Sequence, residues 1–111
     1  MTGLIPILDP DICACLRDVI DPELGLNIVD LGLVLSAARI GSAIEVTFTL
    51  TSRACPLGGL IRSKVRQALA LAFPEAEAIE ARLVWDPAWS EDMVTDHGFE
   101  LLGMKRTRTN A

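Results

Sequence analysis

Cys55 is the residue whose setting in the sequence most clearly suggests chemistry. It is followed by Pro56, which is favoured at the first position of a helix, and then by a segment with helical periodicity. Free backbone N–H groups and the dipole at a helix N-terminus lower the pKa of a thiol, and Arg53 adds to this if its side chain turns inward. The resulting thiolate is a nucleophile and a ligand for soft metals. The alternative is a small buried residue that closes the helix end.

Three carboxylates form the second candidate group. Asp21 and Glu23 flank Pro22 after the first predicted helix, and Asp30 lies at the start of an otherwise apolar predicted strand. Asp21 is well suited to turn chemistry, which is the alternative to a functional role. A polar residue such as Asp30 needs a partner in apolar surroundings. The functional interpretation places all three near Cys55, where they tune a metal or dock a partner.

The other reactive residue types carry weaker signals. Cys13 and Cys15 lie two positions apart on a predicted helix, so they point to different sides and are expected to pack rather than to share an ion. His97 would have to lie within hydrogen-bond reach of Cys55 for the chain to be a small cysteine enzyme. Trp89 either pins the C-terminal tail to the sheet or anchors a partner protein.

Composition and charge argue against several classes of protein. The formal net charge is −5, and nucleic-acid binding depends on neutralising phosphates, so we expect no nucleic-acid partner. No segment approaches the roughly 20 apolar residues that span a bilayer, so no membrane partner is expected. The chain has 3 cysteines and no secretion signal, which favours a reducing cytoplasm over a disulfide framework.

The elements that must position these residues follow from hydrophobic periodicity. Asp9 is a suitable N-cap and Pro10 suits the first turn of a helix. Gly41 and Ser42 suit a two-residue hairpin turn. The predicted order is a helix over residues 9–20, a loop over 21–27, strands over 28–40 and 43–51, a loop to residue 59, a helix to about 73, a strand over 78–86 and a short helical tail.

Alternation along the two hairpin strands predicts which side chains face the core. In the first strand, Gly32 suggests a bulge or a close backbone contact. The second strand has the cleanest period of two in the chain. The predicted inward residues are Val29, Leu31, Leu33, Leu35, Ile44, Val46, Phe48 and Leu50, and the predicted outward residues of the second strand are Glu45, Thr47, Thr49 and Thr51.

This order predicts an α+β fold. We expect a two-layer α-β-β-α-β domain with a small three-stranded mixed sheet, helices on one face and a short C-terminal helix. The 111 residues are expected to form a single domain over 1–111. Its core should cover about residues 9–104, and residues 105–111 should form a basic tail.

Several motifs, in order and at matching spacing, resemble the iron–sulfur cluster assembly factor family, which includes SufT and PaaD proteins. The chain does not carry the cysteine-rich C-terminal extension of PaaD-type members, so the resemblance points to a SufT-like form. It covers roughly residues 9–104. The motifs are DPELG at 21–25, NIVDLGLV at 27–34, TSRACP at 51–56, VWDPAW at 84–89 and LG at 102–103.

The resemblance implies a non-enzymatic, accessory role in iron–sulfur protein maturation. It points to Cys55 as the reactive cysteine and a transient ligand of iron or a cluster. The implied partners are iron–sulfur assembly proteins and client apo-proteins, and a homodimer is left open. The residues expected to line the site are Asp21, Glu23, Asp30, Thr51, Arg53 and Pro56, with Trp89 as a partner-binding residue.

Ligand count limits the mechanism, because iron–sulfur clusters are usually held by four thiolate-type ligands. One plausible cysteine excludes a stable cluster within a monomer. Three hypotheses remain: a cluster bridged by two copies of Cys55 with external thiols, transient handling of iron or a cluster by Cys55, and a metal-free adaptor. A small cysteine-dependent enzyme is the least favoured alternative.

Overall fold

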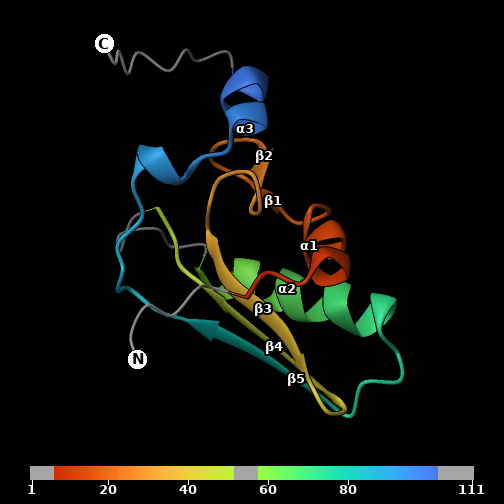
Figure 1. Cartoon of the computed structure of the whole chain (residues 1–111). Coiled ribbons are helices and arrows are strands. Elements are labelled where there is room, and N and C mark those ends of the chain that lie inside the picture. The colour runs from red at the N-terminus through yellow and green to blue at the C-terminus, as the bar shows by residue number, and fades with distance from the viewer. Residues whose placement is uncertain (1–6, 52–57, 103–111) are drawn as a thin grey trace.

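The computed structural model describes residues 7–51 and 58–102. It forms an α+β fold with a three-stranded sheet in the order β3 (Val34–Ile40), β4 (Ala43–Phe48) and β5 (Ala78–Leu83). β3 and β4 are antiparallel, whereas β4 and β5 are parallel, so the sheet is mixed as expected. Helices α1 (Pro10–Leu16) and α2 (Gly58–Ala72) lie on one side of it, and the C-terminal segment extends beyond one end (Figure 1).

The β3–β4 hairpin forms where the sequence predicts it. Gly41 adopts a φ of 60°, a conformation that glycine reaches without steric cost, and β4 begins two residues later. Alternation along β4 buries the expected face in the core. The buried residues of this face are Ile44, Val46, Phe48 and Leu50.

Helix α2 presents one apolar stripe to that face of the sheet. Ile61, Val65 and Leu69 recur every four residues and are fully buried. Ala68 is half-buried, whereas Ala72, in the last turn, is exposed. Within the described residues α2 begins at Gly58, so the predicted helix start at Cys55 and Pro56 lies outside the part of the chain that the structure describes.

Helix α1 is shorter than the sequence predicts. Its N-cap is Asp9, whose carboxylate accepts the backbone N–H groups of Asp11 and Ile12 at 2.9 and 3.1 Å. The helix ends at Leu16 rather than at residue 20. The following residues instead form a two-stranded sheet, in which β1 (Ile20–Asp21) pairs with β2 (Leu26–Asn27). Backbone pairing across this short hairpin is the reason that the helix does not continue.

The predicted strand over residues 28–40 is wrong in its first half. Residues 28–33 form turns, in which Leu31 N–H donates to Asn27 and Leu33 N–H donates to Ile28. The predicted alternation fails there because Ile28, Leu31 and Leu33 are all fully buried. The pairing register of β3 with β4 shifts between Val34 and Ser36. The bulge suggested by Gly32 is therefore present, but a few residues later in the chain than Gly32.

Gly32 lies against the C-terminal segment, as its presence in an apolar run suggested. Its φ is 80°, and a Cβ added there would overlap the backbone carbonyl of Met93. Met93 belongs to the short 3-10 helix η1 (Glu91–Met93), which precedes α3 (Asp96–Leu101). The glycine therefore permits the C-terminal segment to pack on the loop after β2.

Replacing Gly32 by alanine is expected to lower the free energy of unfolding by about 3 kcal/mol, from backbone strain and from displacement of Met93. Gly25→Ala is the matched control, because Gly25 also has a positive φ, 70°, but a Cβ there would meet nothing within 4 Å. Urea denaturation of both variants measures the difference. Equal losses would show that the contact with Met93 has no energetic importance.

The remaining boundaries differ modestly from expectation. β4 ends at Phe48 rather than at residue 51, and β5 ends at Leu83 rather than at residue 86. The expected short helix near the C-terminus is present as α3. No helix among the described residues is both long enough and apolar enough to cross a bilayer. The basic tail at 105–111 lies outside the described residues.

Candidate functional site

The loop that carries Cys55 is bracketed by two described residues, Thr51 and Gly58. A Cβ on Gly58 would lie 2.9 Å from Leu50 Cδ1, so the start of α2 packs directly on the end of the segment that leads into the loop. Arg53, Cys55 and Pro56 themselves lie outside the described residues. The loop therefore leaves and re-enters the fold at one place, the end of the sheet where β4 and β5 terminate.

Thr49 and Thr51 lead into this loop, and the structure treats them differently. Thr51, a predicted site residue, is half-buried. Thr49 was predicted to face outward, but it is fully buried, and its hydroxyl has no hydrogen-bond partner among the described residues. The loop after β2 reaches this residue through a backbone hydrogen bond, a contact that alternation within one strand does not report. Thr49 N–H donates to the Leu33 carbonyl at 2.9 Å.

Asp21 acts in turn chemistry, the alternative that its sequence context left open. Its side chain is almost fully buried, and its carboxylate accepts the backbone N–H of Glu23 at 2.7 Å and that of Leu24 at 3.3 Å. Its backbone carbonyl accepts Gly25 N–H at 2.8 Å. Glu23 is exposed at the tip of this turn. Of these two carboxylates, therefore, Glu23 is the one available to another molecule.

Asp30 is the centre of a buried hydrogen-bond network. Its carboxylate accepts Asn27 Nδ2–H at 2.8 Å and the Thr95 hydroxyl at 2.9 Å, and the side chain of Asn27 accepts Asp30 N–H at 2.8 Å. Thr95 is in turn the N-cap of α3, since its hydroxyl accepts Gly98 N–H at 2.9 Å. Asp30 therefore joins the β1–β2 sheet to α3 and meets the requirement for a partner.

Electrostatics keep this buried carboxylate ionised. Burial by itself would raise the pKa of Asp30, but hydrogen bonds from Asn27 and Thr95 and the positive charges of Arg17 and His97 outweigh it and hold the pKa below its usual value. The Arg17 contact is long, 3.8 Å from Nε to Oδ2, and the Arg17 side chain is half-exposed. The hydrogen bonds therefore matter more than this ion pair.

Sequence reasoning missed Asn27 and Thr95 as partners of Asp30. The spacing of Asn27 and Asp30, three residues apart, is typical of a side chain that closes a turn, and Thr95 precedes Gly98 by the spacing of an N-cap. Each signal was available locally. Their meeting was not, because Thr95 and Asp30 are 65 positions apart in the sequence.

A backbone hydrogen bond joins the segment after Asp30 to the residues that precede the Cys55 loop. Leu33, three residues after Asp30, is bonded to Thr49, two residues before Thr51. Trp89 lies in the same region, half-buried, with its Nε1–H donating to the Leu31 carbonyl at 2.6 Å. Trp89 thus fastens the C-terminal segment to the loop after β2, rather than to the sheet as expected.

Cys13 and Cys15 are held by packing, as expected. Cys13 is buried in the core, and Cys15 is half-buried, with its thiol donating to the Ala68 carbonyl of α2 at 3.2 Å. Burial raises the pKa of both thiols. For Cys13 the charge of Arg17 opposes this in part, and for Cys15 the charge of Asp18 reinforces it. Both thiols are therefore poor nucleophiles and poor metal ligands.

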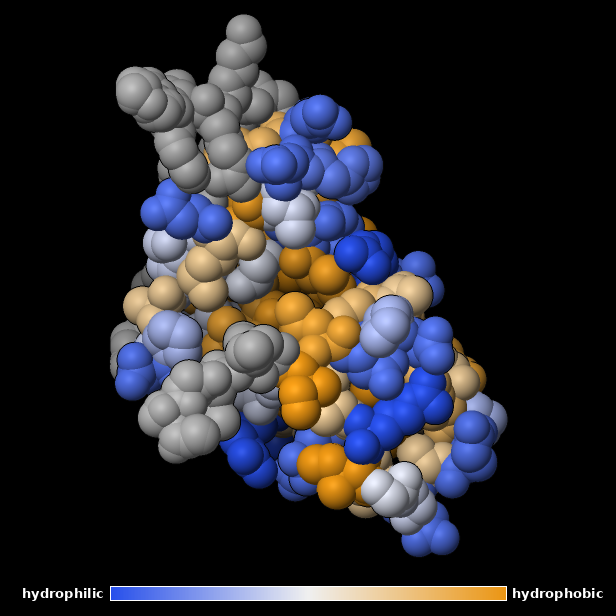
Figure 2. All heavy atoms as spheres, in the orientation of Figure 1, coloured by the Kyte–Doolittle hydropathy of each residue, from blue (hydrophilic) through white to orange (hydrophobic). Residues whose placement is uncertain are grey.

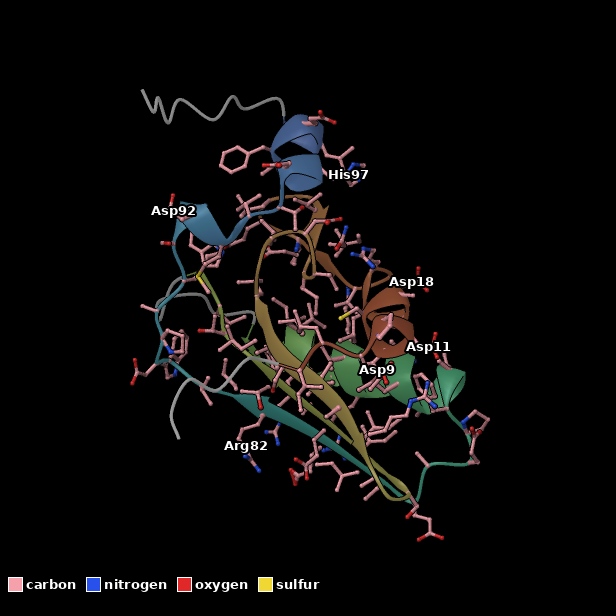
Figure 3. The ribbon with its side chains drawn as sticks, in the orientation of Figure 1. Asp9, Asp11, Asp18, Arg82, Asp92 and His97 are labelled. Atoms are coloured by element: carbon pink, nitrogen blue, oxygen red, sulfur yellow. The ribbon has the colours of Figure 1, made fainter. Side chains whose placement is uncertain are left out.

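His97 is exposed on α3, at the far end of the molecule from the hairpin turn of β3 and β4 (Figure 3). Cys55 lies outside the described residues, so the pairing required for a cysteine enzyme stays a prediction. Within residues 7–51 and 58–102, no group of three or more His, Cys, Asp or Glu side chains is placed to hold a metal ion. The described residues thus frame the loop without forming a metal centre.

Comparison with known proteins identifies what the chain resembles. A sequence model of the family described as iron–sulfur cluster assembly protein matches residues 9–83. The chain is 38% identical to the Fe-S protein maturation auxiliary factor YitW of Bacillus subtilis over 99 residues, which cover 88% of this chain and 96% of YitW. It is 41% identical to the Fe-S protein maturation auxiliary factor SufT of Staphylococcus aureus over 87 residues, which cover 78% and 98% of the two chains.

The fold agrees with the sequence match. A crystal structure of a domain of unknown function from Bacillus anthracis superposes with a TM-score of 0.80 at 39% sequence identity, covering 86% of this chain and 92% of that one. The family match over residues 9–83 includes the positions of the sheet, of α1 and α2 and of the segment that contains Cys55.

Proposed function

The chain belongs to the iron–sulfur cluster assembly protein family, and we propose that it is an accessory factor in iron–sulfur protein maturation that uses Cys55 transiently. In this proposal iron or a cluster is cargo rather than a resident cofactor. Relatives in Bacillus subtilis and Staphylococcus aureus are named auxiliary factors, which supports an accessory, non-catalytic role. The proposed partners are iron–sulfur assembly proteins and client apo-proteins, and the proposed location is the cytoplasm.

One structural observation carries the assignment to Cys55. Cys13 and Cys15 are both committed to packing, and burial raises the pKa of each thiol. That leaves Cys55 as the cysteine available for cargo chemistry. A single thiolate is far short of the four that usually hold a cluster, so the remaining ligands must come from small thiols or from the partner proteins. Such shared ligation suits transfer rather than storage.

The residues around the loop have proposed supporting roles. Thr51 leads directly into the loop, and Arg53 and Pro56 flank Cys55 in the sequence. Asp21 and Asp30 keep the neighbouring turns in place through the hydrogen bonds described above. We propose that the exposed Glu23 carboxylate contacts a partner protein. The exposed part of the Trp89 ring is proposed to contact the same partner.

A metal-free adaptor is the second candidate function. It is favoured by the absence, within the described residues, of a group of side chains able to hold a metal. An adaptor would bind its client as well with Cys55→Ala as with the natural residue, but less well with Glu23→Lys. Exposed Asp92→Lys on η1 is the matched control for the change of charge.

Anaerobic incubation with iron and sulfide tests whether Cys55 handles cargo. The natural protein, in the presence of a small thiol, is expected to develop iron–sulfur charge-transfer absorbance that Cys55→Ser lacks. Cys15→Ser is the control, because serine also donates a hydrogen bond to the Ala68 carbonyl and should leave the spectrum unchanged. Identical spectra for the natural protein and Cys55→Ser would leave the adaptor as the proposed function.

A further inference from the structure

The outer edge of β5 is open to another strand. β5 is the last strand in the sheet order, and Val84 N–H donates to the Phe48 carbonyl of the neighbouring segment. Because backbone groups alternate along a strand, the N–H and C=O groups of Ile79, Ala81 and Leu83 point away from β4. No described strand pairs with them. The opposite edge differs, since Ala37 N–H and C=O on β3 are bonded to Ile7 and Asp9.

The sequence of this edge is complementary to itself when reversed. Residues 79–83 read Ile-Glu-Ala-Arg-Leu, so reversal exchanges Ile79 with Leu83 and Glu80 with Arg82, and leaves Ala81 in place. Glu80 and Arg82 are exposed, and Figure 3 shows Arg82 projecting from β5. Ile79 and Leu83 are half-buried on the other face. An antiparallel copy would therefore meet opposite charges on one face and apolar side chains on the other.

We propose that β5 pairs with β5 of a second copy of this chain, antiparallel and centred on Ala81. The two three-stranded sheets then join into one continuous six-stranded sheet about a twofold axis. In this register Ala81 faces Ala81 of the partner subunit, and Ile79 faces the partner's Leu83, as hydrogen-bonded pairs. Glu80 faces the partner's Arg82 as a non-hydrogen-bonded pair, the closer kind, in which ion pairs form most readily.

Charge selects this register over its neighbours. Moving the twofold centre by one residue, from Ala81 to Arg82, would place Arg82 opposite the partner's Arg82. Moving it to Glu80 instead would place Glu80 opposite the partner's Glu80. Both arrangements bring like charges together, which is destabilising for directly opposed residues. The Ala81-centred register is the one that converts both charges on each strand into attractive pairs.

Arg62 limits the strength of this pairing. Its Nε–H donates to the Ala81 carbonyl at 2.9 Å from α2, so one acceptor of the open edge is already occupied. A carbonyl oxygen accepts two hydrogen bonds, but the guanidinium must shift to admit a neighbouring strand. Pairing over five residues is also small compared with the roughly 1,200 Å² of stable interfaces. The dimer is therefore expected to be weak and to depend on protein concentration.

The proposed dimer keeps the ends of the two β4 strands apart. Phe48, the last residue of β4, is level with Leu83, and the β4 strands of the two copies run in opposite directions. With strand spacings of about 4.8 Å and a rise of about 3.3 Å per residue, the two β4 ends lie roughly 20 Å apart. The arrangement separates the two points at which the described chain leads into the Cys55 segments.

A pair of charge reversals tests the register by sedimentation velocity over a range of protein concentrations. All proteins carry Cys55→Ser, which excludes dimers linked by a Cys55 disulfide, and all measurements are made under reducing conditions, so the result does not depend on the proposed function. E80R and R82E should each weaken self-association about tenfold or more, because both ion pairs become repulsive. An equimolar mixture of E80R and R82E should dimerise again, since each strand then meets a strand of opposite charge.

Further variants separate this edge from other surfaces. R62A frees the Ala81 carbonyl and should strengthen self-association, with the amides of Ile79 and Leu83 gaining hydrogen-exchange protection as concentration rises. Exposed Glu100 lies on α3 and not on the sheet, so E100R is the control and should not change association. Self-association that is unaffected by E80R and R82E, a mixture that stays monomeric, or no association even with R62A would overturn the proposal.

Discussion

Cells whose chromosomal copy encodes Cys55→Ser are expected to lose most of the activity of iron–sulfur client enzymes, about tenfold, while the variant protein accumulates to normal levels. The physical reason is that serine has nearly the shape of cysteine, but its hydroxyl does not ionise near neutral pH and binds soft metals poorly. Enzyme assays in cell extracts, with immunoblots of the client and of the variant, measure the effect. Restoration of activity by added iron and sulfide in the extracts would identify the missing step as cluster delivery.

The matched controls are serine variants at the two packed cysteines. Cys15→Ser retains a donor for the Ala68 carbonyl and should leave client activity unchanged. Cys13→Ser introduces a hydroxyl into the core and should lower stability without a specific effect on iron–sulfur clients. Normal client activity with Cys55→Ser would refute a role of the thiol in cells, and equal losses in all three variants would indicate a loss of protein rather than of chemistry.

Asp30→Ala is expected to lower the free energy of unfolding by about 4 kcal/mol. The carboxylate is almost fully buried, and its removal leaves the Asn27 amide and the Thr95 hydroxyl without their acceptor. Unsatisfied buried donors cost about 1–3 kcal/mol each, more when the lost partner is charged. Because Thr95 caps α3, the amides of residues 96–101 should lose hydrogen-exchange protection before the rest of the protein.

The acid dependence of stability provides a second measurement of the same carboxylate. The pKa of Asp30 is below its usual value in the folded state, so the unfolded chain binds a proton more readily and stability rises with pH. Its contribution is complete above the unfolded pKa of about 3.9 and is lost as pH falls through the lower, folded pKa. The loss of stability on acidification should therefore be smaller in Asp30→Ala than in the natural protein.

Exposed Asp18→Ala is the control for this carboxylate (Figure 3). A surface substitution of this kind should change the free energy of unfolding by less than about 0.5 kcal/mol. If Asp30→Ala destabilises no more than Asp18→Ala, the network around Asp30 does not hold α3 in place. If α3 keeps its protection while the rest of the chain is destabilised, another contact anchors it.

The apolar surface where several segments of the chain meet could not be predicted from any one of those segments. On the face shown in Figure 2, apolar residues gather in the middle, between the parts of the surface that are mostly polar. A groove of about 530 Å³ is lined by residues of three segments distant in sequence, among them Leu8, Cys13, Leu35 and Met93. Periodicity within one segment cannot report which other segments will cover it.

The sequence by itself determined the elements whose signals are local. Period-two alternation and Gly41 specify the β3–β4 hairpin, and the four-residue spacing of Ile61, Val65 and Leu69 specifies α2. The α+β class and the mixed sheet follow from the order of these elements. The motifs around Cys55 and the family that they indicate were also readable in the chain, since they depend on residue identity and spacing. The chemistry proposed for Cys55 follows from these motifs and from its position before Pro56 in the sequence.

Tertiary structure alone decided what the buried polar residues do. Residues 28–33 have strand-like alternation, yet they form turns. Asp30 forms hydrogen bonds with Asn27, three positions away, and with Thr95, 65 positions away. Thr49 has the alternation of an exposed residue, yet it is buried and bonded through its backbone to Leu33, in the loop after β2. Periodicity reports which face of an element is apolar. It carries no information about a second covering layer, because the contacts that create it join residues far apart in the chain.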